Sequence, residues 1–330
     1  MLSASPKILI IRLSSIGDIV LTTPVMRCLK QDLTGVKVHY LTKPAFKSVL
    51  DSNPFIDKIW YWEGNKTLKK LKLEEFDCVI DLHNNIRTRK IKWYFRINHV
   101  LKKWVSFNKI NILKMLAVLT KSPRVLPKKH IVDRYMETVL SLGVKYDNKG
   151  LDFFISAENR IDIQDYFSNL NPFNYYVYAI GGQHNTKKLP FHKKKELLKK
   201  LKMPVILLGG PDDINEGNLI ASAIPNCYNA CGDFNLQQTA SIIEQSRKVF
   251  THDTGLMHIA AALLKPIVVI WGNTIPEFGM YPYYPKGFHD YENQSLEVKV
   301  YCRPCSKIGF KQCPWGHFKC MENQNFTLIK

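Results

Sequence analysis

The chain has 330 residues, of which 45% are hydrophobic, and its formal net charge is +19. This length suits two domains of ordinary size, and the apolar content excludes a disordered chain. No apolar run approaches the roughly 20 residues of a membrane-spanning helix. A strand-like run follows residues 1–6 directly, so we expect no signal peptide and a cytoplasmic protein.

The first half opens on a strand at residues 7–13, too apolar to be covered on only one face. A tight turn, 14–18, leads into a helix at 19–31 with Pro24 in its first turns. The turn ends in Asp18 and lacks the glycine-rich phosphate-binding fingerprints. Position alone fits a helix cap as well as a catalytic carboxylate. We expect further strands at 36–41, 56–60, 77–81 and 101–105, and helices at 44–51, 86–95, 108–119 and 131–142.

The middle of the chain joins this alternating series of strands and helices to a second series. After a turn at 146–150, we expect a strand at 151–155 and a helix at 158–170. The second series has expected strands at 175–180, 204–208, 226–230, 246–250 and 266–271, and helices at 193–201, 214–223, 236–245 and 259–264. Such alternation predicts two doubly wound α/β domains, 1–158 and 159–330, whose ligands bind at the carboxyl ends of the strands.

A polar turn stands between the strand at 246–250 and the helix at 259–264. It reads Thr251-His252-Asp253-Thr254-Gly255-Leu256-Met257-His258. A helix start offers unpaired N–H groups and a partial positive charge, which suit a phosphate, and Gly255 lets the backbone approach a ligand closely. By itself this turn predicts an anion site.

The positive charge is concentrated in one stretch. Between Leu82 and Val132 there are thirteen Lys and Arg residues and no Asp or Glu, and Trp93 and Trp104 are interleaved with them. A solvated basic face is the plain alternative, but the lack of acids favours an anionic partner. Nucleic acid, a phosphorylated glycolipid and an anionic bilayer surface all fit this stretch.

Four cysteines close the chain with a regular spacing. They are Cys302, Cys305, Cys313 and Cys320, with His317 between the last two. Thiolates at such spacing can hold a structural zinc or an iron–sulfur cluster, although the middle gap is shorter than in a usual zinc ribbon. A cytoplasmic location disfavours disulfides. Reduced thiols in a compact tail are the third alternative.

Several motifs in chain order resemble glycosyltransferase family 9, the ADP-heptose:lipopolysaccharide heptosyltransferases. The motifs are residues 14–18 with Pro24, 79–82, 187–190, 209–213 and 253–258, and residues 271–276 are similar to a closing G-x-T-x-P segment. The resemblance covers nearly the whole chain. It implies a GT-B fold, in which two Rossmann-like domains face each other across a cleft. It also implies inverting, metal-independent transfer from a nucleotide sugar, usually ADP-heptose, to Kdo or heptose of the lipopolysaccharide inner core.

The resemblance also implies roles for particular residues. Asp18 is the expected catalytic base, and Lys187 is expected to hold the donor diphosphate, although position alone makes it one more surface lysine. The remaining expected donor contacts are Thr186, Asp213, Asp253, the backbone of Thr254, Gly255 and Leu256, and His258. Asp213 departs from the family, which more often has Glu there, and His258 fits a buried core histidine equally well.

Two arginines are candidates for binding an anionic acceptor. Arg87 follows the strand at 77–81, and Arg134 is a second candidate of the same kind. The expected partners are therefore ADP-heptose, an anionic glycolipid and the inner face of the cytoplasmic membrane, with no nucleic acid and no catalytic cofactor. The alternatives are a family member with another sugar or acceptor, a basic nucleic-acid-binding protein with a zinc tail, and a nicotinamide oxidoreductase, which the missing fingerprint disfavours.

Overall fold

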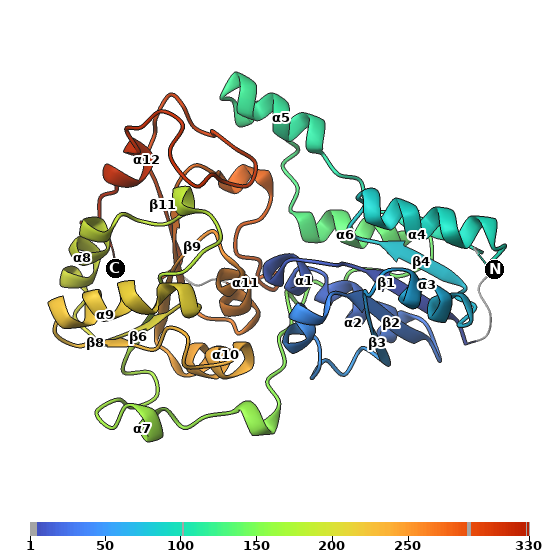
Figure 1. Cartoon of the computed structure of the whole chain (residues 1–330), viewed down its shortest axis with the longest axis horizontal. Coiled ribbons are helices and arrows are strands. Elements are labelled where there is room, and N and C mark those ends of the chain that lie inside the picture. Colours follow the sequence, from blue (N-terminus) through green and yellow to red (C-terminus); the bar gives the residue numbers. More distant parts are fainter. Residues whose placement is uncertain (1–4, 101, 289–291, 328, 330) are drawn as a thin grey trace. The chain divides into compact units, whose positions relative to one another are not determined.

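The computed structural model describes residues 5–100, 102–288, 292–327 and 329. The chain divides into two compact units, one made of Met1–Lys109 and Lys129–Phe154, the other of Ile110–Lys128 and Ile155–Lys330. Each unit is built on a parallel sheet flanked by helices (Figure 1), which confirms the prediction of two α/β domains. None of the helices in the described part of the chain combines the length and apolar content needed to cross a bilayer.

The first unit has a five-stranded sheet in the order β3-β2-β1-β4-β5. Its central strand β1 is buried on both faces, which explains its unbroken apolar sequence. The strands are β1 (Lys7–Ile11), β2 (Lys37–Thr42), β3 (Lys58–Tyr61), β4 (Cys78–Asp81) and β5 (Trp104–Ser106). The helices are α1 (Ile16–Val20), α2 (Thr23–Asp32), α3 (Asn65–Lys72), α4 (Ile86–Ile97) and α6 (Ile131–Leu140), with a 3₁₀ segment at Pro44–Val49.

The helix expected at 19–31 is two helices, α1 and α2. The hydroxyl of Thr22 donates to the carbonyl of Ile19 over 2.6 Å, and that of Thr23 donates to Val20 over 2.7 Å. These bonds compete with continued helical pairing, and Pro24 has no N–H with which to continue it. Pro24 therefore lies in the first turn of a new helix rather than inside a longer one.

A buried ion cluster joins α2 to the segment after α6. The guanidinium of Arg27 is bidentate on Asp147, over 2.8 and 2.9 Å, and also contacts Asp152 and the carbonyl of Gly150. All three charged side chains are largely shielded from solvent. Since the two carboxylates are compensated by one cation, the cluster depends on Arg27.

We expect Arg27→Met to lower the free energy of unfolding by about 3–5 kcal/mol, because it leaves two shielded carboxylates without their cation. The measurement is urea unfolding at neutral pH. The matched control is Lys66→Met, which removes an exposed pair with Glu63 and leaves the unfolding midpoint unchanged. An Arg27→Met midpoint equal to that of the control would contradict this account.

The second unit has a six-stranded parallel sheet in the order β11-β10-β9-β6-β7-β8. The strands are β6 (Tyr176–Ala179), β7 (Val205–Leu208), β8 (Cys227–Asn229), β9 (Lys248–His252), β10 (Ile267–Trp271) and β11 (Gln294–Glu297). The helices are α5 (Asn111–Thr120), α7 (Ile163–Tyr166), α8 (Phe191–Lys200), α9 (Ile214–Ala223), α10 (Leu236–Gln245), α11 (Gly255–Ala262) and α12 (Lys319–Glu322). Short 3₁₀ segments cover Pro123–Val125, Ala157–Asn159, Asn185–Lys187, Pro211–Asp213 and Pro276–Phe278.

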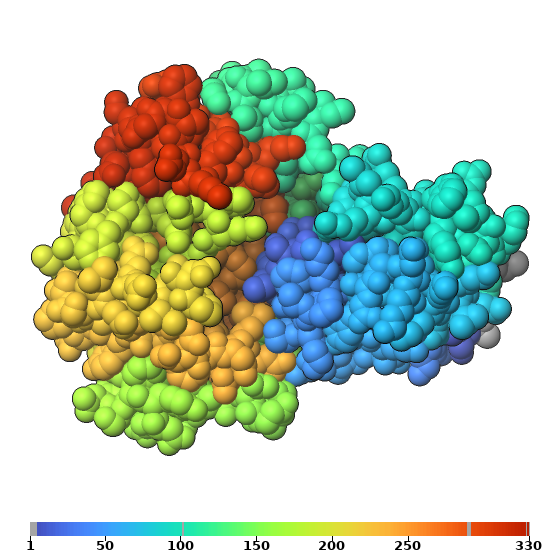
Figure 2. All heavy atoms as spheres, in the orientation of Figure 1, coloured from blue at the N-terminus to red at the C-terminus, as the bar shows by residue number. Residues whose placement is uncertain are grey.

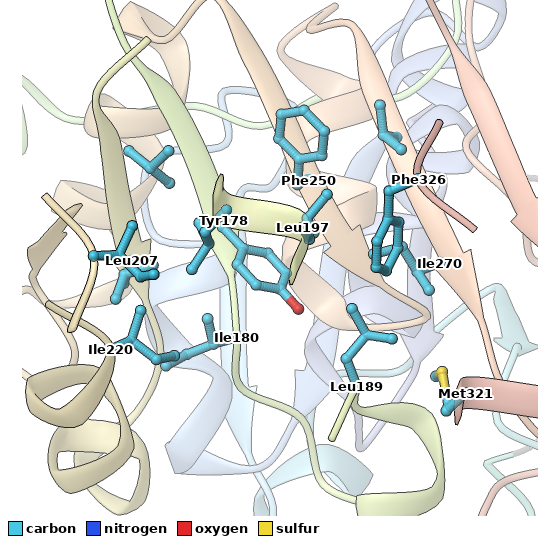
Figure 3. Close-up of a cluster of buried hydrophobic side chains, with 14 of the residues drawn as sticks. Tyr178, Ile180, Leu189, Leu197, Leu207, Ile220, Phe250, Ile270, Met321 and Phe326 are labelled. Carbon is cyan, nitrogen blue, oxygen red and sulfur yellow. The ribbon is translucent and has the colours of Figure 1, made fainter. Parts of the chain in front are cut away.

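One core lies on the face of this sheet that α8 and α9 cover. Tyr178, Phe250 and Leu197 come together from β6, β9 and α8, and the C-terminal segment adds Met321 and Phe326 (Figure 3). The cysteine-containing tail is therefore part of the folded second unit and not an appendage.

Residues 110–128 fall within the predicted first domain, 1–158, but they pack with the second unit. Ala117 of α5 and Leu126 form a small cluster with Ile275 and Phe278. The ammonium of Lys121 also donates to the carbonyl of Pro304 over 3.1 Å. The chain thus enters the second unit at Ile110, returns to the first at Lys129, and leaves it finally after Phe154.

The connection between the two series also differs from expectation. Residues 151–155 form no strand, and residues 158–170 form only the 3₁₀ segment Ala157–Asn159 and α7. Polar side chains take up backbone and side-chain bonds here, since Asp162 accepts from the N–H of Gln164 and the amide of Asn159 donates to the hydroxyl of Ser156. Such local bonds compete with a continuous helix.

Candidate active site

Each parallel sheet has a point where the chain reverses its winding, and polar residues gather there in both. In the first sheet this point lies between the neighbouring strands β1 and β4. Asp18 lies in α1 just after β1, and Asp81 ends β4. In the second sheet the point lies between β6 and β9, and Lys187 and Asp253 follow these strands. Ligands of doubly wound sheets bind in this position.

The carboxylate of Asp18 is held on both oxygens. One oxygen pairs with the guanidinium of Arg12 over 2.7 Å. The other accepts from the hydroxyl of Ser15 over 2.8 Å and from its N–H over 3.2 Å. The side chain keeps 19% of its surface exposed. Asp18 therefore takes part in capping α1, which was the alternative to a catalytic role, and it still presents a carboxylate to solvent.

Burial by itself would raise the pKa of Asp18, but Arg12 and the bonds from Ser15 outweigh burial and leave the pKa below its usual value. The carboxylate is consequently ionised at neutral pH. Arg12 is itself fixed, since it donates to the carbonyl of Leu82 over 2.7 Å and to the hydroxyl of Tyr135 over 3.0 Å. A single arginine inside an otherwise apolar strand run was the sequence signal for this partner.

Beside Asp18 lies a group of polar residues, which consists of Asp81 from the motif at 79–82 and of His83 and Lys109, which no motif includes. Asp81 accepts from the N–H groups of His83 and Asn84 over 3.0 and 2.7 Å, and burial raises its pKa. Burial, with Arg12 and Lys109 nearby, lowers the pKa of His83 to about 3, so this imidazole is neutral. Its Nδ1 atom is buried and has no hydrogen-bond partner among the described residues. Burial likewise lowers the pKa of Lys109.

The two arginines proposed for acceptor binding lie in different surroundings. Arg87 is exposed in the first turn of α4. Arg134 is buried in α6, with its guanidinium 5.5 Å from the ring centre of Phe107. Its Nε and Nη2 atoms make no hydrogen bond to any described residue, and burial lowers its pKa. Buried donors without partners are costly, so Arg134 is the arginine better prepared for an anion.

In the second unit, Lys187 and Asp253 meet directly. The ammonium of Lys187 lies 2.6 Å from one carboxylate oxygen of Asp253, and the hydroxyl of Thr274 donates to the same oxygen over 3.0 Å. Both charged side chains are mostly shielded from solvent. This contact makes Lys187 a fixed cation at the strand ends rather than one more surface lysine. Thr274 belongs to the segment 271–276, whose family likeness was its sequence signal.

Asp213 is held inside its own loop. One oxygen accepts from the N–H of Gly210 over 3.0 Å, and the other lies 3.4 Å from the ammonium of Lys188. A Cβ atom at Gly181 would come within 2.4 Å of this carboxylate, so the glycine makes room for it. Asp213 thus joins the loops that follow β6 and β7, beside Lys188.

The start of α11 supplies backbone donors. Thr254 precedes the helix in an extended conformation, and its side chain makes no capping bond, so the first-turn N–H groups at Gly255 and Leu256 are not capped by it. The hydroxyl of Thr254 lies 3.2 Å from that of Thr251 instead. His258 is buried on the same helix, in keeping with its interpretation as a core histidine.

A histidine that the motifs left without a role fixes the Lys187 loop. His252, at the end of β9, accepts the N–H of Leu189 over 3.0 Å. Burial, together with Lys194 and Lys188, lowers its pKa far below the usual value, so the ring is neutral. The sequence placed His252 in the polar turn, but only the fold shows that it faces the loop after β6.

Thr186 lies in the same loop, but its hydroxyl is engaged elsewhere. It donates to the carbonyl of Phe310 over 3.1 Å and accepts the N–H of Phe310 over 2.8 Å. Arg303 donates to the carbonyls of Gly272 and Thr274 over 2.6 and 2.8 Å. The C-terminal tail therefore braces the loops that carry Lys187 and Thr274.

The four tail cysteines are all free thiols. Cys302 lies 3.8 Å from the Nε2 atom of His317, and Cys305 donates to the carbonyl of Cys302 over 3.0 Å. Burial, with Cys302 beside it, raises the pKa of Cys305 to about 12, and burial raises that of Cys320 to about 11. Across the described part of the chain, no three or more His, Cys, Asp or Glu side chains are arranged to hold a metal ion.

Comparison with known proteins identifies the class of this protein. The family model described as glycosyltransferase family 9 (heptosyltransferase) matches residues 65–309. Because this model covers more than half of the chain, the chain is a glycosyltransferase, and its two parallel α/β sheets have the GT-B fold of related structures. It belongs to glycosyltransferase family 9, which confirms the resemblance seen in its motifs.

Individual relatives agree with this assignment. Lipopolysaccharide heptosyltransferase 2 of Salmonella typhimurium is 25% identical over 298 residues, which cover 82% of this chain and 84% of that protein. A family 9 glycosyl transferase from Veillonella parvula has a similar structure, with a TM-score of 0.72 and 21% identity over 91% of this chain and 90% of the other. For the E. coli heptosyltransferase WaaC with ADP, the TM-score is 0.63 at 18% identity, covering 88% and 92%.

Proposed function

We propose that this chain transfers heptose from ADP-heptose to Kdo or heptose of the lipopolysaccharide inner core, with inversion at the anomeric carbon. The observation that carries the proposal is the contact of Lys187 with Asp253 beside the start of α11, at the switch point of the second sheet. Relatives named as lipopolysaccharide heptosyltransferases, and a related structure with ADP, support the choice of sugar and nucleotide.

The donor diphosphate binds where cationic and backbone donors are already fixed. Lys187 takes a phosphate oxygen, and the N–H groups at the start of α11 take others. As the glycosidic bond to the diphosphate breaks, negative charge grows on these oxygens, and donors that need not move stabilise it. Asp253 and Thr274 keep Lys187 in place, and Asp253 also accepts from sugar hydroxyls. Asp213 contacts the ribose, whereas Thr186 acts indirectly, through its bonds to Phe310.

The acceptor hydroxyl gives its proton to Asp18. A carboxylate of low pKa suffices, because the hydroxyl becomes acidic as its oxygen bonds to the anomeric carbon. Arg12 and Ser15 keep the carboxylate ionised and oriented. Arg134 and Lys109 bind an acceptor carboxylate or phosphate, and Arg87 contributes from the exposed first turn of α4. The reaction then leaves a protonated Asp18, free ADP and the new glycosidic bond.

We propose a mechanism with no step through a metal, as the family resemblance implies. Structural zinc in the tail stays a hypothesis for which metal analysis of purified, untagged protein is the test. About one zinc per chain would support it, and a content below roughly a tenth would reject it. We place the enzyme at the inner face of the cytoplasmic membrane, where its glycolipid acceptor is built, and propose no nucleic-acid partner.

The proposal is tested by incubating the purified chain with ADP-heptose and a series of truncated core acceptors. We expect release of ADP and an acceptor whose mass increases by one heptose unit. ADP-glucose and UDP-glucose serve as competing donors. Transfer of a hexose in preference to heptose would favour the alternative family member with another sugar, and salt-sensitive RNA or DNA binding without any transfer would favour the nucleic-acid alternative.

Arg303 provides a separate prediction about the tail. Arg303→Lys keeps the charge but loses the planar fork that holds the carbonyls of Gly272 and Thr274. We expect KM for the donor to rise about tenfold, while KM for the acceptor stays unchanged. Steady-state kinetics with each substrate varied in turn measures this split. An equal loss with both substrates would mean that Arg303 only stabilises the fold.

A further inference from the structure

Helix α5 (Asn111–Thr120) exposes a row of large apolar side chains. Ile112, Met115, Leu116 and Leu119 are 71%, 50%, 39% and 68% exposed. Their spacing of three, four and seven residues puts them on one side of the helix. We define these four residues as the α5 stripe. Figure 2 shows α5 at the surface of the molecule, in green at the top of the view.

The opposite side of α5 is already used for packing. Ala117, with Leu113 and Val118 beside it, contacts the cluster that contains Ile275 and Phe278. The ammonium of Lys114 lies 5.4 Å from the ring centre of Phe278. The helix is therefore fixed by one side on the second unit, and it cannot turn the α5 stripe inward without giving up these contacts.

The surroundings of the α5 stripe are cationic. Lys121 follows the helix directly, Arg124 and Lys128 are exposed in the next turns, and no Asp or Glu occurs between residues 82 and 132. An exposed apolar row edged by Lys and Arg, without acids, fits a surface that is apolar below and anionic above. An anionic bilayer matches both the apolar row and its cationic edge, so charge complementarity favours a lipid surface as the occupant.

We propose that the α5 stripe inserts into the headgroup region of an anionic phospholipid bilayer, with the exposed Arg124 and Lys128 against the lipid phosphates. The inference deepens the proposed function and rests on it for the identity of the membrane, because a glycolipid acceptor is itself embedded there. The stripe would hold the second unit at the lipid surface without any spanning segment.

The test is sedimentation of the full chain with lipid vesicles. Vesicles of phosphatidylcholine with about one-third phosphatidylglycerol supply the anionic surface, and pure phosphatidylcholine vesicles are compared. We expect the double variant Ile112→Ser with Leu119→Ser to bind the anionic vesicles at least roughly tenfold more weakly than wild type. Leu219→Ser, at an exposed leucine of α9 in the same unit, is the matched control and keeps wild-type binding. Binding of the wild type should fall with added salt.

Other outcomes overturn the proposal. Equal binding of wild type and double variant would mean that the α5 stripe is not the membrane contact. A wild-type dimer in size-exclusion chromatography that the double variant abolishes, without vesicle binding by either, would make the stripe an interface between copies. Transfer to a soluble truncated acceptor is measured on the same proteins and should not change. Absence of transfer by the wild type would reject the proposed function. The vesicle measurement would still decide whether the α5 stripe binds lipid.

Discussion

Asp18→Asn is expected to lower kcat about 10²- to 10⁴-fold, because the variant cannot accept the proton of the acceptor hydroxyl. Affinity for ADP should stay close to wild type, since the expected nucleotide contacts all lie in the second unit. An assay of ADP release measures kcat, and isothermal titration calorimetry with ADP measures the affinity. Asp51→Asn, at an exposed carboxylate paired with Lys47, is the control and should keep full activity.

Asp18→Asn also removes the charge that faces buried Arg12, so melting temperatures must be compared. Asp18→Glu retains a carboxylate and should recover part of the lost rate if proton transfer is the cause. A folded Asp18→Asn variant with near-normal kcat would contradict the assignment of the base.

Because the pKa of Asp18 is lowered in the folded state, the direction in which its contribution to stability changes with pH is fixed. Its carboxylate stabilises the folded state above the unfolded-state pKa of about 3.9, and this contribution is lost as pH falls through the lower folded-state pKa. The base is therefore ionised throughout the range above about pH 5. Any acidic limb of kcat in that range must come from another group, and Asp18→Glu should leave its position unchanged.

Lys187→Ala is expected to reduce kcat about 10²- to 10³-fold, because the departing diphosphate loses a fixed cation. Affinity for ADP should fall as well, which separates this variant from Asp18→Asn. Lys199→Ala, at an exposed lysine in the last turn of α8, controls for the loss of one positive charge. Unchanged kcat and ADP affinity in Lys187→Ala would exclude Lys187 from the donor site.

Local patterns were sufficient to predict the architecture. Apolar runs such as Ile8–Ile11 and the amphipathic helices between them gave two parallel sheets, and α9 and α10 have the predicted bounds. The predictions were wrong where hydroxyls and short polar side chains compete for the backbone, as at Thr22 and Asp162. The packing of α5 with the second unit depends on Ile275 and Phe278, far away in the sequence, so periodicity could not show it.

The motifs pointed to the charged residues of the candidate site but not to their partners. The contact of Lys187 with Asp253 and that of Asp18 with Arg12 join residues from neighbouring strand ends or opposite ends of one turn. The bonds of Thr186 to Phe310 depend on where the tail folds, which no local pattern records. Nor does any local pattern record that the Nε and Nη2 atoms of Arg134 are buried without a hydrogen-bond partner among the described residues, because burial depends on the packing of the whole unit.

The proposed mechanism is a single displacement, in which Asp18 would activate the acceptor while Lys187 holds the leaving diphosphate. The anomeric configuration of the product tests this most directly, and NMR of the purified heptosylated acceptor measures it. We predict the configuration opposite to that of the ADP-heptose donor. A product that keeps the donor's configuration would require two displacements and would contradict the mechanism.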